Sequence, residues 1–139
     1  MNAEIRAGTA ADVEAVLAVW ERSRSVPART PDTAEFVETL LERDPGALLV
    51  AQLDGHVVGA LIAGWDGWRG NVYRLAVLPE HRREGIARAL VEAGHERLHR
   101  LGARRVTALV GGDEGAAHRL WRALGYHRDE FVHRFVRNL

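Results

Sequence analysis

The sequence predicts an α/β domain built on a mixed sheet with helices on both faces. Three observations favour this class. Residues 48–64 have the pattern of a β-hairpin around Asp54-Gly55, a strand runs into a helix near Gly85, and apolar side chains recur at helical spacing in other segments. With 139 residues, of which 47% are apolar and 27% charged, the chain has the size and composition of a single globular domain, residues 1–139.

The N-terminal part is predicted to form a strand and two helices. The strand covers Ala3–Ala7, and Thr9 and Asp12 are then spaced as in a capping box. Apolar residues on one helical face follow: Val13, Val16, Leu17 and Trp20. A second helix is predicted to open at Thr30-Pro31 and to stop at Asp44-Pro45-Gly46.

The middle of the chain is predicted as three strands. Leu48–Leu53 and His56–Gly64 flank the pair Asp54-Gly55, which favours a tight two-residue turn. A second turn covers residues 65–70 and leads into the strand Asn71–Leu78. These segments supply the centre of the predicted sheet.

The C-terminal part alternates helices and strands. A helix after Gly85 ends at Gly102, because glycine commonly ends a helix in the left-handed conformation. A strand over Arg105–Val110 and a helix over Asp113–Leu124 follow, and Tyr126–Val136 forms one or two closing strands. The expected sheet therefore has six to seven strands, mostly antiparallel, in a domain with about four helices.

Composition excludes several function classes. The 19 acidic residues balance the 19 basic ones, so neither a nucleic acid nor a membrane surface is an expected partner. The absence of cysteine removes thiolate metal sites and a cysteine nucleophile, and no metal site is predicted. Without an apolar run of membrane-spanning length or a signal-peptide core, a cytoplasmic location is expected. A homodimer stays open.

The junction at Gly85 has the features of a phosphate site. The first N–H groups of a helix have no intrahelical acceptor, and the helix dipole adds positive charge there. Gly85 and Ala87 leave the backbone accessible, and Arg82, Arg83 and Arg88 bring positive charge. An ordinary turn explains the same residues. Because GxxxxGK[ST] and GxGxxG are both absent, neither a P-loop nor a Rossmann site is indicated.

Two motifs resemble those of the GNAT N-acetyltransferases. Residues 82–87, RREGIA, match R/Q-x-x-G-x-G/A within the longer pattern from Val77 to Leu90. Residues 117–126 resemble the family's A-x-x-L-Y-x-x-L-G-F/Y segment. The resemblance implies acetyl-coenzyme A as co-substrate, with its pantetheine arm on the backbone of Leu75, Ala76 and Val77. It also implies that the pyrophosphate lies on the amides of residues Arg83, Glu84, Gly85, Ile86, Ala87 and Arg88.

The sequence departs from the family at two positions. Trp121 stands where many relatives have a tyrosine that protonates the departing thiolate, and an indole N–H is not an acid at neutral pH. Glu114 stands where asparagine commonly contacts the cofactor arm. We interpret Trp121 as a wall of the cofactor site, with helix core packing as the alternative.

Three further residues are candidates for catalysis. His118 precedes Trp121 by about one helical turn and could donate a proton, but in a chain with seven histidines the first explanation is a solvated surface histidine. Tyr73 occupies a strand position where some relatives have a glutamate base, but a phenol is a poor base. Asp66 could bind or deprotonate an amine, and aspartate before glycine is also typical of turns.

The resemblance predicts acetyl transfer from acetyl-coenzyme A to an amine of a small molecule or peptide by direct attack in a ternary complex. The loops Arg22–Thr30 and Gly64–Gly70, which would shape the acceptor pocket, contain no motif that identifies the acceptor. Trp121 and Glu114 favour the alternative of a catalytically weak acyl-coenzyme A-binding or sensing domain. Turnover with amines distinguishes the two hypotheses.

Overall fold

The computed structural model describes residues 2–23, 32–111 and 115–139. The elements in chain order are β1 (Glu4–Ala7), η1 (Ala10–Asp12), α1 (Val13–Ser23), α2 (Ala34–Arg43), β2 (Leu48–Leu53), β3 (His56–Trp65), β4 (Gly70–Val77), η2 (Pro79–His81), α3 (Ile86–Leu101), β5 (Val106–Ala108) and α4 (Gly115–Ala123), where η marks a 3-10 turn. None of the helices in these described ranges combines the length and the apolar run needed to span a bilayer.

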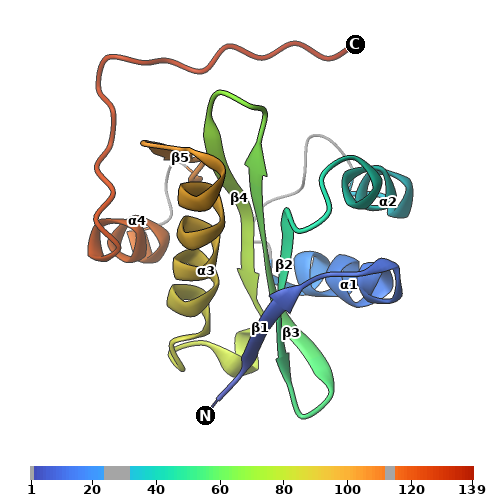
Figure 1. Cartoon of the computed structure of the whole chain (residues 1–139). Coiled ribbons are helices and arrows are strands. Elements are labelled where there is room, and N and C mark those ends of the chain that lie inside the picture. The colour runs from blue at the N-terminus through green and yellow to red at the C-terminus, as the bar shows by residue number, and fades with distance from the viewer. Residues whose placement is uncertain (1, 24–31, 112–114) are drawn as a thin grey trace. The chain divides into compact units, whose positions relative to one another are not determined.

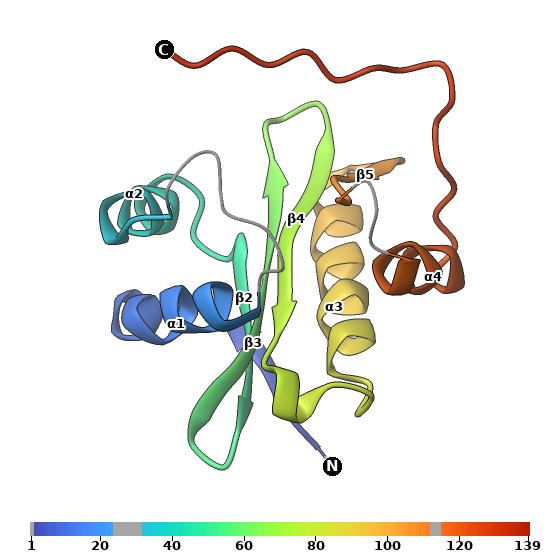
Figure 2. The same ribbon diagram turned by 180° about the vertical axis from the view of Figure 1, so that it is seen from behind.

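The chain divides into two compact units, Met1–Leu109 and Val110–Leu139. The first unit holds the sheet, in the order β1-β2-β3-β4-β5. Neighbouring strands are antiparallel except for β4 and β5, which are parallel. Within this unit α1 and α2 cover one face of the sheet and α3 covers the other (Figures 1 and 2). The predicted mixed sheet with helices on both faces is therefore confirmed, whereas a single domain over residues 1–139 stays a prediction.

The sheet has five strands in the described residues, so the prediction of six to seven is wrong. The missing strands are those expected over Tyr126–Val136, where the structure has no strand. The apolar side chains there, Phe131, Val132, Phe135 and Val136, occur in adjacent pairs and are exposed. A strand would place such pairs on both of its faces, so this segment lacks the alternation that gives a strand one buried face.

Helix α2 begins later than predicted. Thr33 is the N-cap, and its hydroxyl accepts a hydrogen bond from the Phe36 amide at 3.2 Å. The helix therefore starts at Ala34 rather than at Thr30-Pro31, because the Thr33 side chain caps its first turn. Residues 30 and 31 lie outside the described residues.

The core between the sheet and the α1–α2 layer is apolar. Its buried members include Val16 and Trp20 from α1, Val37 from α2, and strand residues such as Val50 and Ile62. The predicted apolar face of α1 is thus confirmed. On the other face, α3 approaches β3 closely because it has a glycine at the contact. A Cβ on Gly94 would lie 3.1 Å from Leu61 Cδ2.

The predicted capping box at the start of α1 is present and is joined by an ion pair from β1. Arg6 donates two hydrogen bonds to the Asp12 carboxylate, at 2.8 and 2.9 Å, and the Thr9 amide donates a third at 2.8 Å. The Arg6 contact, supported by the Thr9 amide, lowers the pKa of Asp12 to about 2 against the opposing effect of burial.

We expect Asp12→Asn to reduce the free energy of unfolding by about 1–2 kcal/mol at pH 7. The folded pKa lies below the unfolded value of about 3.9, so the stabilisation is fully present above that value and is lost as the pH falls toward 2. Roughly half of the difference between wild type and variant should be gone at pH 3. Urea unfolding at pH 7 and pH 3 measures it. An equal difference at both pH values contradicts the assignment.

Candidate functional site

The turn between η2 and α3 contains two residues with left-handed backbone conformation. Arg83 has φ +65° and Gly85 has φ +81°. Gly85 is the N-cap of α3, and its carbonyl accepts the first helical hydrogen bond, from Ala89 N at 3.0 Å. A Cβ added at Gly85 would meet no protein atom within 4 Å. The space in front of this glycine is therefore open.

The start of α3 has the properties of an anion site. The amides of Ile86, Ala87 and Arg88 belong to the first turn and have no intrahelical acceptor. The residues before them, Arg82 to Gly85, are exposed. N–H groups without an acceptor at the positive end of a 16-residue helix favour phosphate, and the missing Cβ at Gly85 lets it approach the backbone. The geometry fits the pyrophosphate that the sequence motif predicts here.

This turn is attached to the C-terminal end of α1. Arg22 forms an ion pair with Glu80, with N–O distances of 2.9 and 3.0 Å to the two carboxylate oxygens. Arg82 donates to the carbonyl oxygens of Val77 at 3.4 Å and Ser23 at 3.3 Å. The Ser23 hydroxyl also donates to Val77 O, at 3.3 Å. Arg82 therefore braces the turn, and a contact of its own with phosphate stays a prediction.

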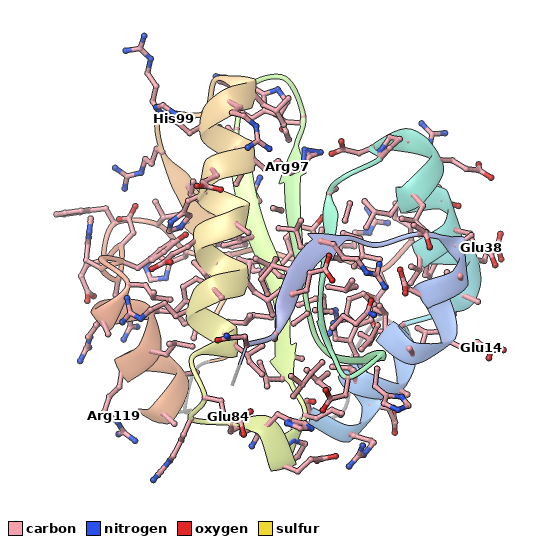
Figure 3. All side chains as sticks on the ribbon, turned by 60° about the horizontal axis from the view of Figure 1, so that its bottom comes forward. Glu14, Glu38, Glu84, Arg97, His99 and Arg119 are labelled. Carbon is pink, nitrogen blue, oxygen red and sulfur yellow. The ribbon has the colours of Figure 1, made fainter. Side chains whose placement is uncertain are left out.

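The other charged side chains of the turn have partners nearby. Glu84, which Figure 3 shows before α3, lies 3.4 Å from His81 Nδ1. Arg88 lies 3.8 Å from the Glu92 carboxylate, one turn further along α3. Arg83 is exposed. The Glu84 carboxylate is held toward His81 by its 3.4 Å contact.

Strand β4 leaves part of its outer edge unpaired. Strand β5 pairs only with Gly70, Asn71 and Val72 of β4, and in the described residues no strand lies beside the rest of that edge (Figure 1). On the inner edge Ala60 pairs with Ala76 and Ile62 with Tyr73. Two β4 residues, Arg74 and Leu75, thus lie opposite Leu61 alone, which makes a β-bulge.

The alternation of β4 determines which backbone groups face the open edge. Leu78 N donates to Val58 O, and in an antiparallel pair every second residue bonds to the partner strand. Ala76 therefore faces β3, while Leu75 and Val77 present their backbone groups to the other edge. The Val77 carbonyl already accepts from Ser23 and Arg82, so Leu75 and the Val77 N–H are the groups directed to this edge, and their predicted contact with the pantetheine arm stays a prediction.

Two of the three candidate catalytic side chains, Tyr73 and Asp66, lie in the first unit. Burial, with a smaller contribution from Asp44, raises the pKa of Tyr73, so its phenol stays protonated at neutral pH. Asp66 is exposed, and its carboxylate accepts from the amides of Arg69 at 2.7 Å and Trp68 at 2.8 Å. These bonds lower the pKa of Asp66, so its interactions are those of a turn residue.

The remaining candidates lie in the second unit. His118 Nε2 is 2.9 Å from the Gly111 carbonyl oxygen. A carbonyl oxygen can only accept, so Nε2 is the donor of this hydrogen bond. Trp121 contacts the Tyr126 ring edge-on, at 4.8 Å between centroids and 78° between planes. Helix α4 ends before Gly125, φ +90°, as predicted. Glu114 lies outside the described residues, so its predicted contact with the cofactor stays a prediction.

The side chains that hold the bulge are not among the residues predicted from the sequence. Trp20 Nε1 donates to Arg74 O at 2.9 Å, and Arg74 Nη2 lies 2.7 Å from Asp32 Oδ1. Arg74 itself has φ +57°. The sequence pattern identifies Trp20 only as an apolar residue of a helical face, and Arg74 only as a strand residue. No local pattern marks a left-handed arginine inside a strand.

Comparisons with known proteins agree with this geometry. The model of the acetyltransferase (GNAT) family matches residues 13–126. The curated acetyltransferase SG1711 of Sodalis glossinidius (strain morsitans) is 35% identical over 130 residues, which are 93% of this chain and 90% of that protein.

Solved structures share the fold at lower identity. AAC(6′)-Iy in complex with the bisubstrate analog CoA-S-monomethyl-acetylneamine has a TM-score of 0.77 and 21% identity, over 100% of both chains. The ribosomal-protein-S18-alanine N-acetyltransferase from Escherichia coli has a TM-score of 0.74 and 19% identity, over 89% of this chain and 77% of that chain.

Proposed function

Because the chain belongs to the GNAT family of acetyltransferases, we propose that it transfers the acetyl group of acetyl-coenzyme A to an amine of a small molecule or a peptide. The observation that carries this proposal is the combination of the open turn at Gly85 with the unpaired edge of β4 next to it in the chain. The first supplies amides for a pyrophosphate, and the second supplies amides for the pantetheine arm and the acetyl carbonyl.

Acetyl-coenzyme A supplies an acetyl group already activated as a thioester. The acceptor nitrogen forms the new C–N bond while the C–S bond breaks, so no cysteine nucleophile is needed. The chain's contribution is binding and orientation, with a backbone N–H at the bulge polarising the acetyl carbonyl. Tyr73 keeps its proton at neutral pH, and the Asp66 carboxylate accepts hydrogen bonds from turn amides, so we assign the amine proton to water.

The structural relatives do not restrict the acceptor to one class of amine. One of them was solved with an acetylneamine derivative, and another is an N-acetyltransferase for the alanine of a ribosomal protein. A likeness of fold at about this identity does not select between small molecules and peptides. The acceptor is therefore proposed as an amine in either class.

Release of free thiol from acetyl-coenzyme A in the presence of a panel of amines tests the proposal. The expected result is thiol release that depends on one class of amine, with a calorimetric binding signal for acetyl-coenzyme A alone. Binding of acetyl-coenzyme A without thiol release, whichever amine is added, would favour the sensing domain instead. No heat at millimolar acetyl-coenzyme A would contradict both functions.

We expect Trp121→Phe to lower turnover by less than about tenfold, against the ~10²–10⁴ typical of removing a general acid. The phenyl ring keeps an aromatic wall and the edge contact with Tyr126, and only the indole N–H is lost. Steady-state kinetics with saturating acetyl-coenzyme A measures it. Loss of all turnover in a folded variant that still binds acetyl-coenzyme A would make the indole N–H a participant.

His118→Gln is the matched variant on the same helix. Glutamine keeps a side-chain N–H donor and removes the titratable ring. If kcat falls less than tenfold, water rather than His118 protonates the departing thiolate. A fall of ~10² or more with unchanged affinity would move the acid role to His118.

A further inference from the structure

The bulge in β4 is held from one side by two side chains. Trp20, on α1, is 5% exposed and donates its indole N–H to the Arg74 carbonyl at 2.9 Å. Asp32, which precedes the N-cap of α2, holds the Arg74 guanidinium at 2.7 Å. Both contacts come from the α1–α2 layer. They fix a residue whose φ of +57° is unfavourable for any side chain with a Cβ.

The indole bond also determines the orientation of one peptide plane. The peptide bond between Arg74 and Leu75 is trans, so the Leu75 N–H points opposite to the Arg74 C=O. Because the carbonyl points to Trp20 in the α1 layer, the Leu75 N–H points away from that layer. Leu75 is also the bulge residue whose backbone faces the unpaired edge of β4.

We infer that Trp20 is a positioning residue for acetyl transfer: its indole N–H orients the Arg74–Leu75 peptide so that the Leu75 N–H donates to the acetyl carbonyl. This inference rests on the proposed function. Trp20 does not touch the reacting atoms and acts only through the peptide. Asp32 assists by holding the Arg74 side chain and thereby the left-handed backbone.

The decisive variant is Trp20→Phe, which keeps an aromatic ring in the core and removes the donor to Arg74 O. Coenzyme A lacks the acetyl carbonyl, so the Leu75 contact contributes only to acetyl-coenzyme A binding. We expect the preference for acetyl-coenzyme A over coenzyme A to fall about three- to tenfold, as expected for one hydrogen bond. kcat should fall at least tenfold, because a misdirected amide no longer polarises the carbonyl.

Two further variants separate positioning from general stability. Val16 lies on the same face of α1 and is fully buried. Val16→Ala therefore removes core volume and leaves the Trp20 indole N–H in place. It should lower the melting temperature and leave the affinity preference unchanged. Arg74→Gly, added to Trp20→Phe, relieves the backbone strain at φ +57° but supplies no donor to the carbonyl, so the preference and kcat should stay at the level of Trp20→Phe.

The measurements are calorimetric affinities for the two ligands and steady-state kinetics. If Trp20→Phe changes both affinities equally, as a loss of stability would, the inference is overturned. The same holds if the double variant regains wild-type values, because relief of strain would then explain the effect. The affinity ratio does not depend on the acceptor. A wild-type protein that binds acetyl-coenzyme A and acetylates no amine contradicts the proposed function, while the ratio still decides the role of Trp20.

Discussion

Gly85→Ala is expected to weaken the binding of acetyl-coenzyme A about 30-fold or more. The new Cβ would occupy the open space in front of the first turn of α3, where the pyrophosphate is proposed to lie. Losing one or two charge-assisted hydrogen bonds to backbone amides accounts for an effect of this size. Isothermal titration calorimetry measures it. A variant with wild-type affinity would place the pyrophosphate elsewhere.

Gly55→Ala provides a matched control for backbone strain. Gly55 lies in the turn between β2 and β3 and has the same φ, +81°, and a Cβ there also meets no atom within 4 Å. Alanine at a positive φ costs about 1 kcal/mol of stability at either position. The two variants should therefore lose similar stability, while only Gly85→Ala loses affinity. Equal affinity losses would attribute the effect to strain.

Asp44→Ala is expected to reduce the free energy of unfolding by about 2–3 kcal/mol, because it leaves a buried guanidinium charge without compensation. Asp44 ends α2 and forms an ion pair with Arg97 of α3, which Figure 3 shows on that helix. The Arg97 side chain is 10% exposed, and its Nε has no hydrogen-bond partner within the described residues. The melting temperature should fall by about 10 °C.

Two variants test this explanation. Glu92→Ala removes the partner of Arg88 in an exposed pair on the same helix, and we expect a change below about 0.5 kcal/mol. Arg97→Met, added to Asp44→Ala, removes the buried charge and should restore part of the stability. Denaturant unfolding of all variants gives the comparison. An Asp44→Ala effect as small as that of Glu92→Ala contradicts the role of the pair.

The sequence predicted the element boundaries best where glycines occur. Gly85, Gly102 and Gly125 all have positive φ and flank helices where predicted. The Asp54-Gly55 turn also joins β2 and β3 as expected. These features depend on contacts within a few residues, since a helix cap or a two-residue turn is satisfied locally. Sequence patterns can therefore predict these helix ends and this turn.

Predictions from sequence patterns were wrong where the local preference of the residues differs from the hydrogen bonds that the folded backbone makes. One or two closing strands were expected over Tyr126–Val136, but a strand needs a partner and one apolar face. The start of α2 was expected at a proline that favours helix N-termini, whereas the Thr33 cap determines it. In both cases composition was a weaker signal than hydrogen bonding.

By itself, the sequence determined the family, the α/β class and the glycine turn before α3, because each is encoded in residues adjacent in the chain. Only the tertiary structure decided how the β4 bulge is held. Trp20 reaches Arg74 across 54 residues. The separate ion pair between Arg97 and Asp44, across 53 residues, depends on the packed fold in the same way. A left-handed arginine in a strand is unfavourable on its own. It persists because distant side chains bind its carbonyl and its guanidinium, and only the packed fold brings those side chains to it.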